Sequence, residues 1–113
     1  MASATILIGE ADPDVRRLLV VLMERLGHEA VVLGSRAEVP PRGDVLLLEP
    51  ASPRCVEAAR VARLFYPDLP VVCMGLAPDG AEFLLDGPVA HLEKPFTVDA
   101  LEAAVAIFAP SPV

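Results

Sequence analysis

Three acidic side chains and a lone lysine stand where apolar runs of the sequence end. Glu10 and Asp12 follow the first run, and Glu49 follows a later one. Lys94, the only lysine among the 113 residues, follows the last run. Carboxylate oxygens can hold a divalent cation or pair with an ammonium group. If the runs are parallel strands of one sheet, these side chains meet beyond its carboxyl edge, where open α/β sheets place their functional crevice.

Five apolar runs alternate with segments of helical pattern. The runs span 4–9, 30–33, 44–49, 70–74 and 89–92. Continuous apolar runs are typical of strands that are buried on both faces. Alternation with helices requires crossover connections and therefore a parallel sheet. We predict an α/β three-layer sandwich with five buried parallel strands.

Capping signals locate three helices. Asp12-Pro13 and Ser52-Pro53 each combine a side-chain cap with proline at the first helical position, and Thr97 caps a last helix over 98–108. Gly27 ends the first helix. Helical spacing predicts core positions at Val15, Leu18, Leu19, Leu22, Met23 and Leu26, then Cys55, Ala58, Ala59, Ala62 and Phe65, and finally Val98, Leu101, Ala104, Val105 and Phe108. Arg63 is expected on the polar face of the second of these helices.

Two crossovers are too short for full helices. Pro40-Pro41 leaves room for at most one helical turn within 35–43. The segment 75–88 accommodates only a short helix around 81–85. Counted in crossover order, the second and fourth helices are therefore shortened. A single domain over 1–113 is expected, with its core over about 4–109 and a tail or linker start at 110–113.

Composition excludes several classes of protein. Sixteen acids against nine bases give a net charge of −7, which argues against direct nucleic-acid binding. Mean hydropathy is high at +0.53. No charge-free stretch reaches the roughly 20 residues of a membrane span, however. Cys55 and Cys73 match no metal-binding spacing, and no signal peptide is recognised, so we expect reduced, buried thiols in a cytoplasmic protein.

The chain resembles the receiver domain of bacterial two-component response regulators. The resemblance covers nearly the whole chain, through Ile6-Leu7-Ile8, Pro13-Asp14-Val15-Arg16-Arg17-Leu18-Leu19, Asp44-Val45-Leu46-Leu47-Leu48, Pro53, Pro70-Val71-Val72 and Lys94-Pro95-Phe96. It implies a flavodoxin-like (CheY-like) fold with strand order 2-1-3-4-5. It also implies a site in which an aspartate accepts a phosphoryl group from a phosphohistidine, assisted by Mg²⁺, a lysine and a Ser or Thr.

Four positions depart from the pattern of that family. Glu49 replaces the acceptor aspartate, and its extra methylene moves the carboxylate by more than about 1 Å, an error that positional catalysis tolerates poorly. Ala11 replaces a metal-binding acid, Gly75 replaces the Ser or Thr, and His91 replaces the aromatic switch residue. Lys94 matches the family's lysine.

The remaining polar residues of the site have simpler interpretations. Glu10 and Glu49 are weak candidate metal ligands, and no cofactor is expected because Ala11 cannot coordinate a metal. Glu10 can instead be a solvated acid at a strand end, and Asp12 a helix cap rather than a ligand. Glu49 and Lys94 are expected to pair across the crevice. His91 is interpreted as a surface histidine, with a pH sensor as the alternative.

Two hypotheses of function follow from the resemblance. The first is a degenerate pseudo-receiver that binds a protein partner without phosphorylation, with its contact face on the last helix at Ala100, Ala103, Ala106 and Ile107. The partner is a second copy, a histidine kinase or a fused output domain. The alternative is a phosphoacceptor modified at Glu49 by a histidine kinase with Mg²⁺. A nucleotide binder is disfavoured because Gly9-Glu10-Ala11-Asp12 lacks a glycine-rich phosphate cradle.

Overall fold

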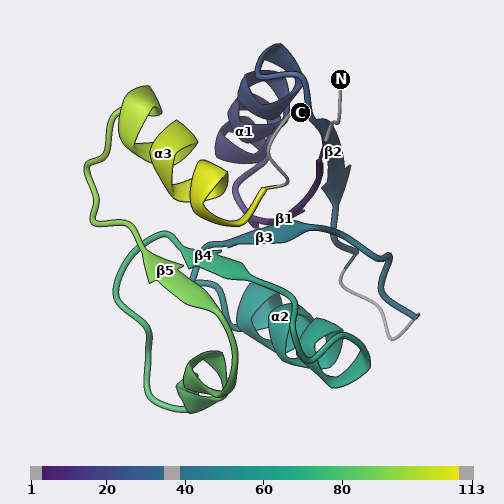
Figure 1. Ribbon diagram of the computed structural model, residues 1–113. Helices are drawn as coiled ribbons and strands as arrows, with labels where there is room; N and C mark the ends of the chain where they lie inside the picture. The colour runs from purple at the N-terminus through teal and green to yellow at the C-terminus, as the bar shows by residue number, and fades with distance from the viewer. Residues whose placement is uncertain (1–3, 35–38, 110–113) are drawn as a thin grey trace.

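The computed structural model describes residues 4–34 and 39–109, and these form one five-stranded parallel sheet flanked by helices (Figure 1). The strands are β1 (Thr5–Gly9), β2 (Glu29–Val32), β3 (Val45–Leu48), β4 (Val71–Cys73) and β5 (Val89–His91). Their order across the sheet is β2-β1-β3-β4-β5. The predicted α/β flavodoxin-like fold and strand order are confirmed.

Three α-helices and one 3₁₀ helix connect the strands. They are α1 (Pro13–Arg25), α2 (Pro53–Phe65), η1 (Glu82–Asp86) and α3 (Val98–Phe108). The capping side chains of α1, α2 and α3 are those predicted: Asp12, Ser52 and Thr97 each accept hydrogen bonds from backbone amides of the first turn. Gly27 follows α1 with a φ of +89°, the left-handed conformation that commonly ends a helix.

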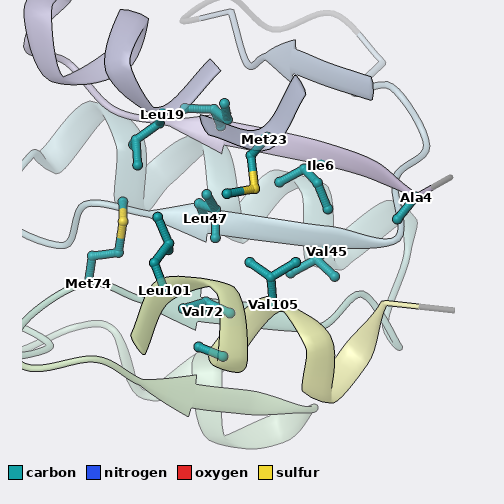
Figure 2. Close-up of a cluster of buried hydrophobic side chains, with 12 residues drawn as sticks. Ala4, Ile6, Leu19, Met23, Val45, Leu47, Val72, Met74, Leu101 and Val105 are labelled. Carbon is teal, nitrogen blue, oxygen red and sulfur yellow. The ribbon is translucent and has the colours of Figure 1, made fainter. Parts of the chain in front are cut away.

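Alternation along the strands divides the core into two layers, one on each face of the sheet. Ile6, Ile8 and Leu47 point toward α1 and α3, where Figure 2 shows the core side chains of that face, Met23 and Leu101 among them. Leu7, Leu46 and Leu48 point the other way, toward α2 and η1. This two-sided burial explains why the central strands read as continuous apolar runs. The edge strands differ from prediction: β2 and β5 have no fully buried residue, because each has a neighbour on one side only.

The predicted helix faces need correction at five positions. Val15, Leu18, Phe65 and Val98 were expected in the core but are 40–56% exposed. Val15, Phe65 and Val98 lie in the first or last turn of their helices, and Leu18 lies at the margin of the apolar stripe of α1. Arg63 was expected on the polar face of α2 but is buried, with 7% of its surface exposed. The buried side of α2 is thus rotated toward Arg63 and away from Phe65.

The two short crossovers agree with the sequence where the structure describes them. Residues 39–44 contain no helix, and the remainder of the predicted single turn, 35–38, lies outside the described residues. The β4–β5 crossover holds only η1, one residue later than the predicted 81–85. The tail 110–113 also lies outside the described residues. No helix in 4–34 or 39–109 is long and apolar enough to cross a membrane.

Candidate functional site

Three strand ends bring the candidate site residues to one edge of the sheet. β1 and β3 are neighbours in register, with Gly9 opposite Leu48, so Glu10 and Glu49 leave adjacent strands at the same level. Lys94 follows β5, two strands away from β3, and its long side chain reaches back to Glu49. The topology therefore joins residues that are 45 positions apart in the sequence.

Glu49 uses both of its carboxylate oxygens. Its Oε2 pairs with the Nζ of Lys94, and its Oε1 accepts a hydrogen bond of 3.2 Å from the backbone amide of Ala51. The Glu49 side chain is nearly buried at 12% exposure, whereas that of Lys94 is half exposed at 49%. The predicted ion pair is therefore present. Because one partner is solvated, it contributes no more than about 1 kcal/mol to stability.

Glu10 and Asp12 are turned toward their own backbone. Glu10 is buried rather than solvated, and its Oε1 accepts a hydrogen bond of 3.0 Å from the amide of Asp12. Asp12 Oδ1 accepts from the amides of Asp14 and Val15 at 2.9 and 3.3 Å, which confirms that it caps α1. The intervening Ala11 is exposed, and its methyl side chain has no atom that could bind a metal. Both acids after β1 thus serve the turn into α1.

This arrangement does not fit a magnesium site. Mg²⁺ requires near-octahedral oxygen coordination that usually includes one or two carboxylates. Among the described residues, no group of three or more His, Cys, Asp or Glu side chains is placed to hold a metal. Glu49 is engaged by Lys94 and Glu10 by the amide of Asp12. The donor set therefore favours an internally paired crevice over a cation site.

Gly75 follows β4 in a backbone conformation that suits glycine alone. Its φ is +136°, outside the range that L-residues adopt readily, although a Cβ built there would make only an ordinary contact of 3.5 Å with Cγ of Pro50. The position thus lacks a hydroxyl and also resists any side chain. The positive φ at this position could not be predicted from the sequence.

We expect Gly75→Ser to lower the free energy of unfolding by about 1–3 kcal/mol, because serine would be forced into the strained conformation or would shift the loop. Urea denaturation followed by circular dichroism measures this change. Gly34→Ser is the matched control, since no atom of residues 4–34 or 39–109 lies within 4 Å of a Cβ built there and its φ is not positive. Equal stability of the two variants would contradict the conclusion that position 75 requires glycine.

Cys73 ends β4 in register with Leu48, the residue before Glu49, and was expected from the sequence only as a buried hydrophobe. It is fully buried, and its Sγ is 3.6 Å from the carbonyl oxygen of Gly75. Burial, and secondarily the negative charge of Glu49, raise the pKa of the Cys73 thiol. A raised pKa keeps this thiol protonated and unreactive at neutral pH. Both Cys73 and Cys55 are buried free thiols, as predicted.

His91 ends β5 beside this crevice, in register with Cys73 on β4. Its side chain is exposed, which agrees with its interpretation as a surface histidine. Lys94 is followed by a cis peptide bond to Pro95.

Arg63 makes a polar cluster near the amino ends of β4 and β5, which sequence reasoning missed. Its guanidinium donates to the carbonyl oxygens of Leu69 at 2.7 Å and Pro88 at 2.6 Å, and to those of Phe83 and Leu84 at 3.2 and 3.3 Å. Burial lowers the pKa of Arg63, which nevertheless stays charged at any physiological pH. The side chain thus ties α2 to the segment before β4, to η1 and to the residue before β5.

Similarity to known proteins is found at the level of structure. No protein-family model matches the chain, and no curated protein matches it. Solved structures of receiver domains do match. The chain is similar to Vibrio cholerae chemotaxis protein CheY4, with a TM-score of 0.76 and 19% identity over 95% of this chain and 99% of that one.

Two further receiver structures are similar over almost their whole length. The receiver domain of sensor histidine kinase PA1611 from Pseudomonas aeruginosa, which has a magnesium ion coordinated in its active site cleft, matches with a TM-score of 0.73 and 19% identity, covering 95% of this chain and 98% of that one. A response regulator receiver protein from Sinorhizobium medicae matches with a TM-score of 0.70 and 24% identity, covering 94% of each chain. The chain therefore has the fold of CheY-like receiver domains.

Proposed function

We propose that the protein is a pseudo-receiver of two-component signalling, a domain that binds a protein partner without being phosphorylated. The observation that carries this proposal is the ion pair between Glu49 and Lys94. In the receiver pattern, the lysine pairs with the phosphoryl group on the acceptor. Here Glu49, at the acceptor position, already pairs with Lys94. The contact that the lysine would make with a phosphoryl group is therefore replaced by this ion pair.

The rest of the crevice supports the same proposal. Ala11 supplies no metal ligand, Glu10 is held by the amide of Asp12, and Gly75 offers no hydroxyl to a phosphoryl group. Phosphoryl transfer depends almost wholly on positioning and charge neutralisation, so each of these departures removes part of the required machinery. The domain acts in the cytoplasm in this proposal, alone or joined to an output domain, and without a cofactor.

The contact surface proposed for the partner is the outer face of α3. Ala103, Ala106 and Ile107 are exposed there, Ile107 to 67%, whereas Ala100 is half-buried. An exposed helix face with so few charges is typical of a contact surface.

Intact-mass spectrometry after incubation with acetyl phosphate and Mg²⁺ tests the proposal. We expect no phosphoryl adduct on the wild-type chain. The second candidate function, a phosphoacceptor modified at Glu49 by a histidine kinase, predicts an adduct that disappears in Glu49→Gln. Such an adduct would overturn the proposal, and an adduct that persists in Glu49→Gln would overturn both.

A further inference from the structure

The sheet has two edge strands, which differ in the residues that flank them. β5 is preceded by Pro88 and followed by Glu93, Lys94 and Pro95. β2 lies at the other edge (Figure 1), and among the described residues it pairs with β1 alone. From Ala30 to Gly34 the chain has no charged residue and no proline. Charges and prolines are what usually keep an edge strand from pairing with another chain, so the β2 edge is the less protected of the two.

The backbone hydrogen bonds of β2 show which of its groups face outward. The amides of Glu29 and Leu33 donate to carbonyl oxygens of β1, both at 2.9 Å. Alternate residues of a parallel ladder bond to the same neighbour, so the amide and carbonyl groups of Ala30 and Val32 point away from β1. Val32 is 41% exposed, and Val31 is half-buried. The β2 edge therefore presents hydrogen-bonding groups together with apolar side chains.

Helix α1 adds two opposite charges beside this edge. Arg17, Val20 and Glu24 are spaced three and four residues apart and form one stripe along α1. A right-handed β1–α1–β2 crossover places this stripe on the side of the helix that lies over β2. Arg17 and Glu24 are exposed, and neither belongs to the two ion pairs found within 4–34 and 39–109.

We propose that the β2 edge binds the β2 edge of a second copy of this chain in antiparallel orientation, so that the two sheets become one. The two-fold axis passes beside Val31. Ala30 of each chain exchanges both backbone hydrogen bonds with Val32 of the other, and the two Val31 side chains meet at the axis. An isologous contact closes on itself and gives a dimer rather than a filament. This contact goes beyond the proposed function and leaves α3 available for its partner.

The position of α1 favours a second copy over an unrelated extended peptide. Val31 lies about 7 Å along β2 from its start, and the midpoint between Arg17 and Glu24 lies about 7 Å from the end of α1. The short connection 26–28 keeps the two points at a similar level. Because α1 lies over β1 and β2, the two α1 helices would be two strand spacings apart, about 10 Å, a normal packing distance. The same axis thus brings Arg17 of each chain to Glu24 of the other.

Engineered cysteines test the register of this contact. In Val31→Cys the two new thiols meet at the axis, within the Cα separation that a disulfide requires. We expect mild oxidation of the full chain to give an interchain disulfide, detected by intact-mass spectrometry, at a yield at least about tenfold above that of Leu33→Cys. Leu33→Cys is the matched control, because Leu33 is also half-buried but lies opposite Glu29 of the other chain. The native cysteines are buried.

Sedimentation velocity over a concentration series measures the association without a cross-link. Val32→Pro removes an outward amide and should raise the dissociation constant at least about tenfold, whereas Val32→Thr keeps the amide and should change it little. Arg17→Glu and Glu24→Arg should each weaken the dimer, and the two combined should restore most of the affinity. Circular dichroism confirms that each variant is folded.

Three results would each overturn the proposal. The first is a wild-type chain that stays monomeric at every concentration. The second is an equal yield of disulfide from Val31→Cys and Leu33→Cys. The third is a dimer that a folded Val32→Pro variant leaves intact. None of these measurements depends on whether Glu49 accepts a phosphoryl group, so failure here is distinguishable from failure of the proposed function.

Discussion

Replacing Arg63 with methionine is expected to lower the free energy of unfolding by about 2–4 kcal/mol, a large share of the roughly 5–15 kcal/mol of a domain this size. Methionine can fill much of the space, but it donates no hydrogen bond. The carbonyl oxygens of Leu69, Phe83, Leu84 and Pro88 would lose the guanidinium that now binds them. Thermal unfolding measures the effect, which corresponds to a fall in Tm of roughly 8–16 °C.

Arg60→Met is the matched control for this prediction. Arg60 lies three residues earlier on α2 and, among the described residues, pairs only with exposed Glu57. Loss of such a surface pair changes stability by less than about 1 kcal/mol. If both methionine variants unfold at the same temperature, the buried cluster contributes little and the prediction is wrong.

Hydrogen exchange adds a readout that general destabilisation would not mimic. Arg63 binds Phe83 and Leu84 within η1 and Pro88 after it, so its removal should speed amide exchange in 81–89 far more than in β1 or β3. Gly87 provides a second check, because a Cβ built there would lie 2.8 Å from the Arg63 guanidinium. Gly87→Ala should therefore cost less in the Arg63→Met background than in the wild-type chain.

The Arg63 cluster also shows where sequence reasoning stops. Strand order, helix ends and the meeting of Glu49 with Lys94 were predictable, because apolar runs, capping residues and strand-end positions are local signals with known spatial consequences. Burial of Arg63 was not. Its position fits the polar stripe of α2, and the carbonyl groups that it binds come from 6 to 25 residues away. Nothing near Arg63 in the sequence indicates that such a cluster will form.

The same distinction applies to the crevice. The missing side chains at Ala11 and Gly75 can be read directly from the sequence. The φ of +136° at Gly75 and the hydrogen bond from the Asp12 amide to Glu10 depend on tertiary geometry. Together they show which of the positions that depart from the receiver pattern can accept the side chain of that pattern. Ala11 is exposed, so a larger side chain can replace it, whereas the positive φ of Gly75 disfavours any other residue.

This difference between the positions determines which variant should regain phosphorylation. We expect Ala11→Asp combined with Glu49→Asp to form an acyl phosphate with acetyl phosphate and Mg²⁺, at a yield at least about a hundredfold above that of the wild-type chain. In the Glu49→Asp change, the shorter side chain would withdraw from Lys94 and leave its ammonium group available for a phosphoryl group. The Ala11→Asp change would supply the carboxylate that the loop between β1 and α1 lacks. Gly75 is left unchanged because serine there is strained.

Intact-mass spectrometry of the single variants measures the contribution of each substitution. Glu49→Asp alone and Ala11→Asp alone should give much lower yields, since each restores only one of the two missing groups. Adding Lys94→Met to the double variant, or omitting Mg²⁺, should also reduce the adduct. A folded double variant that stays unmodified would mean that the crevice differs from a phosphoacceptor site by more than these side chains. A clear adduct would instead show that Ala11 and Glu49 account for the loss of phosphorylation. It would also support the interpretation that the Glu49–Lys94 ion pair takes the place of the contact between the lysine and a phosphoryl group.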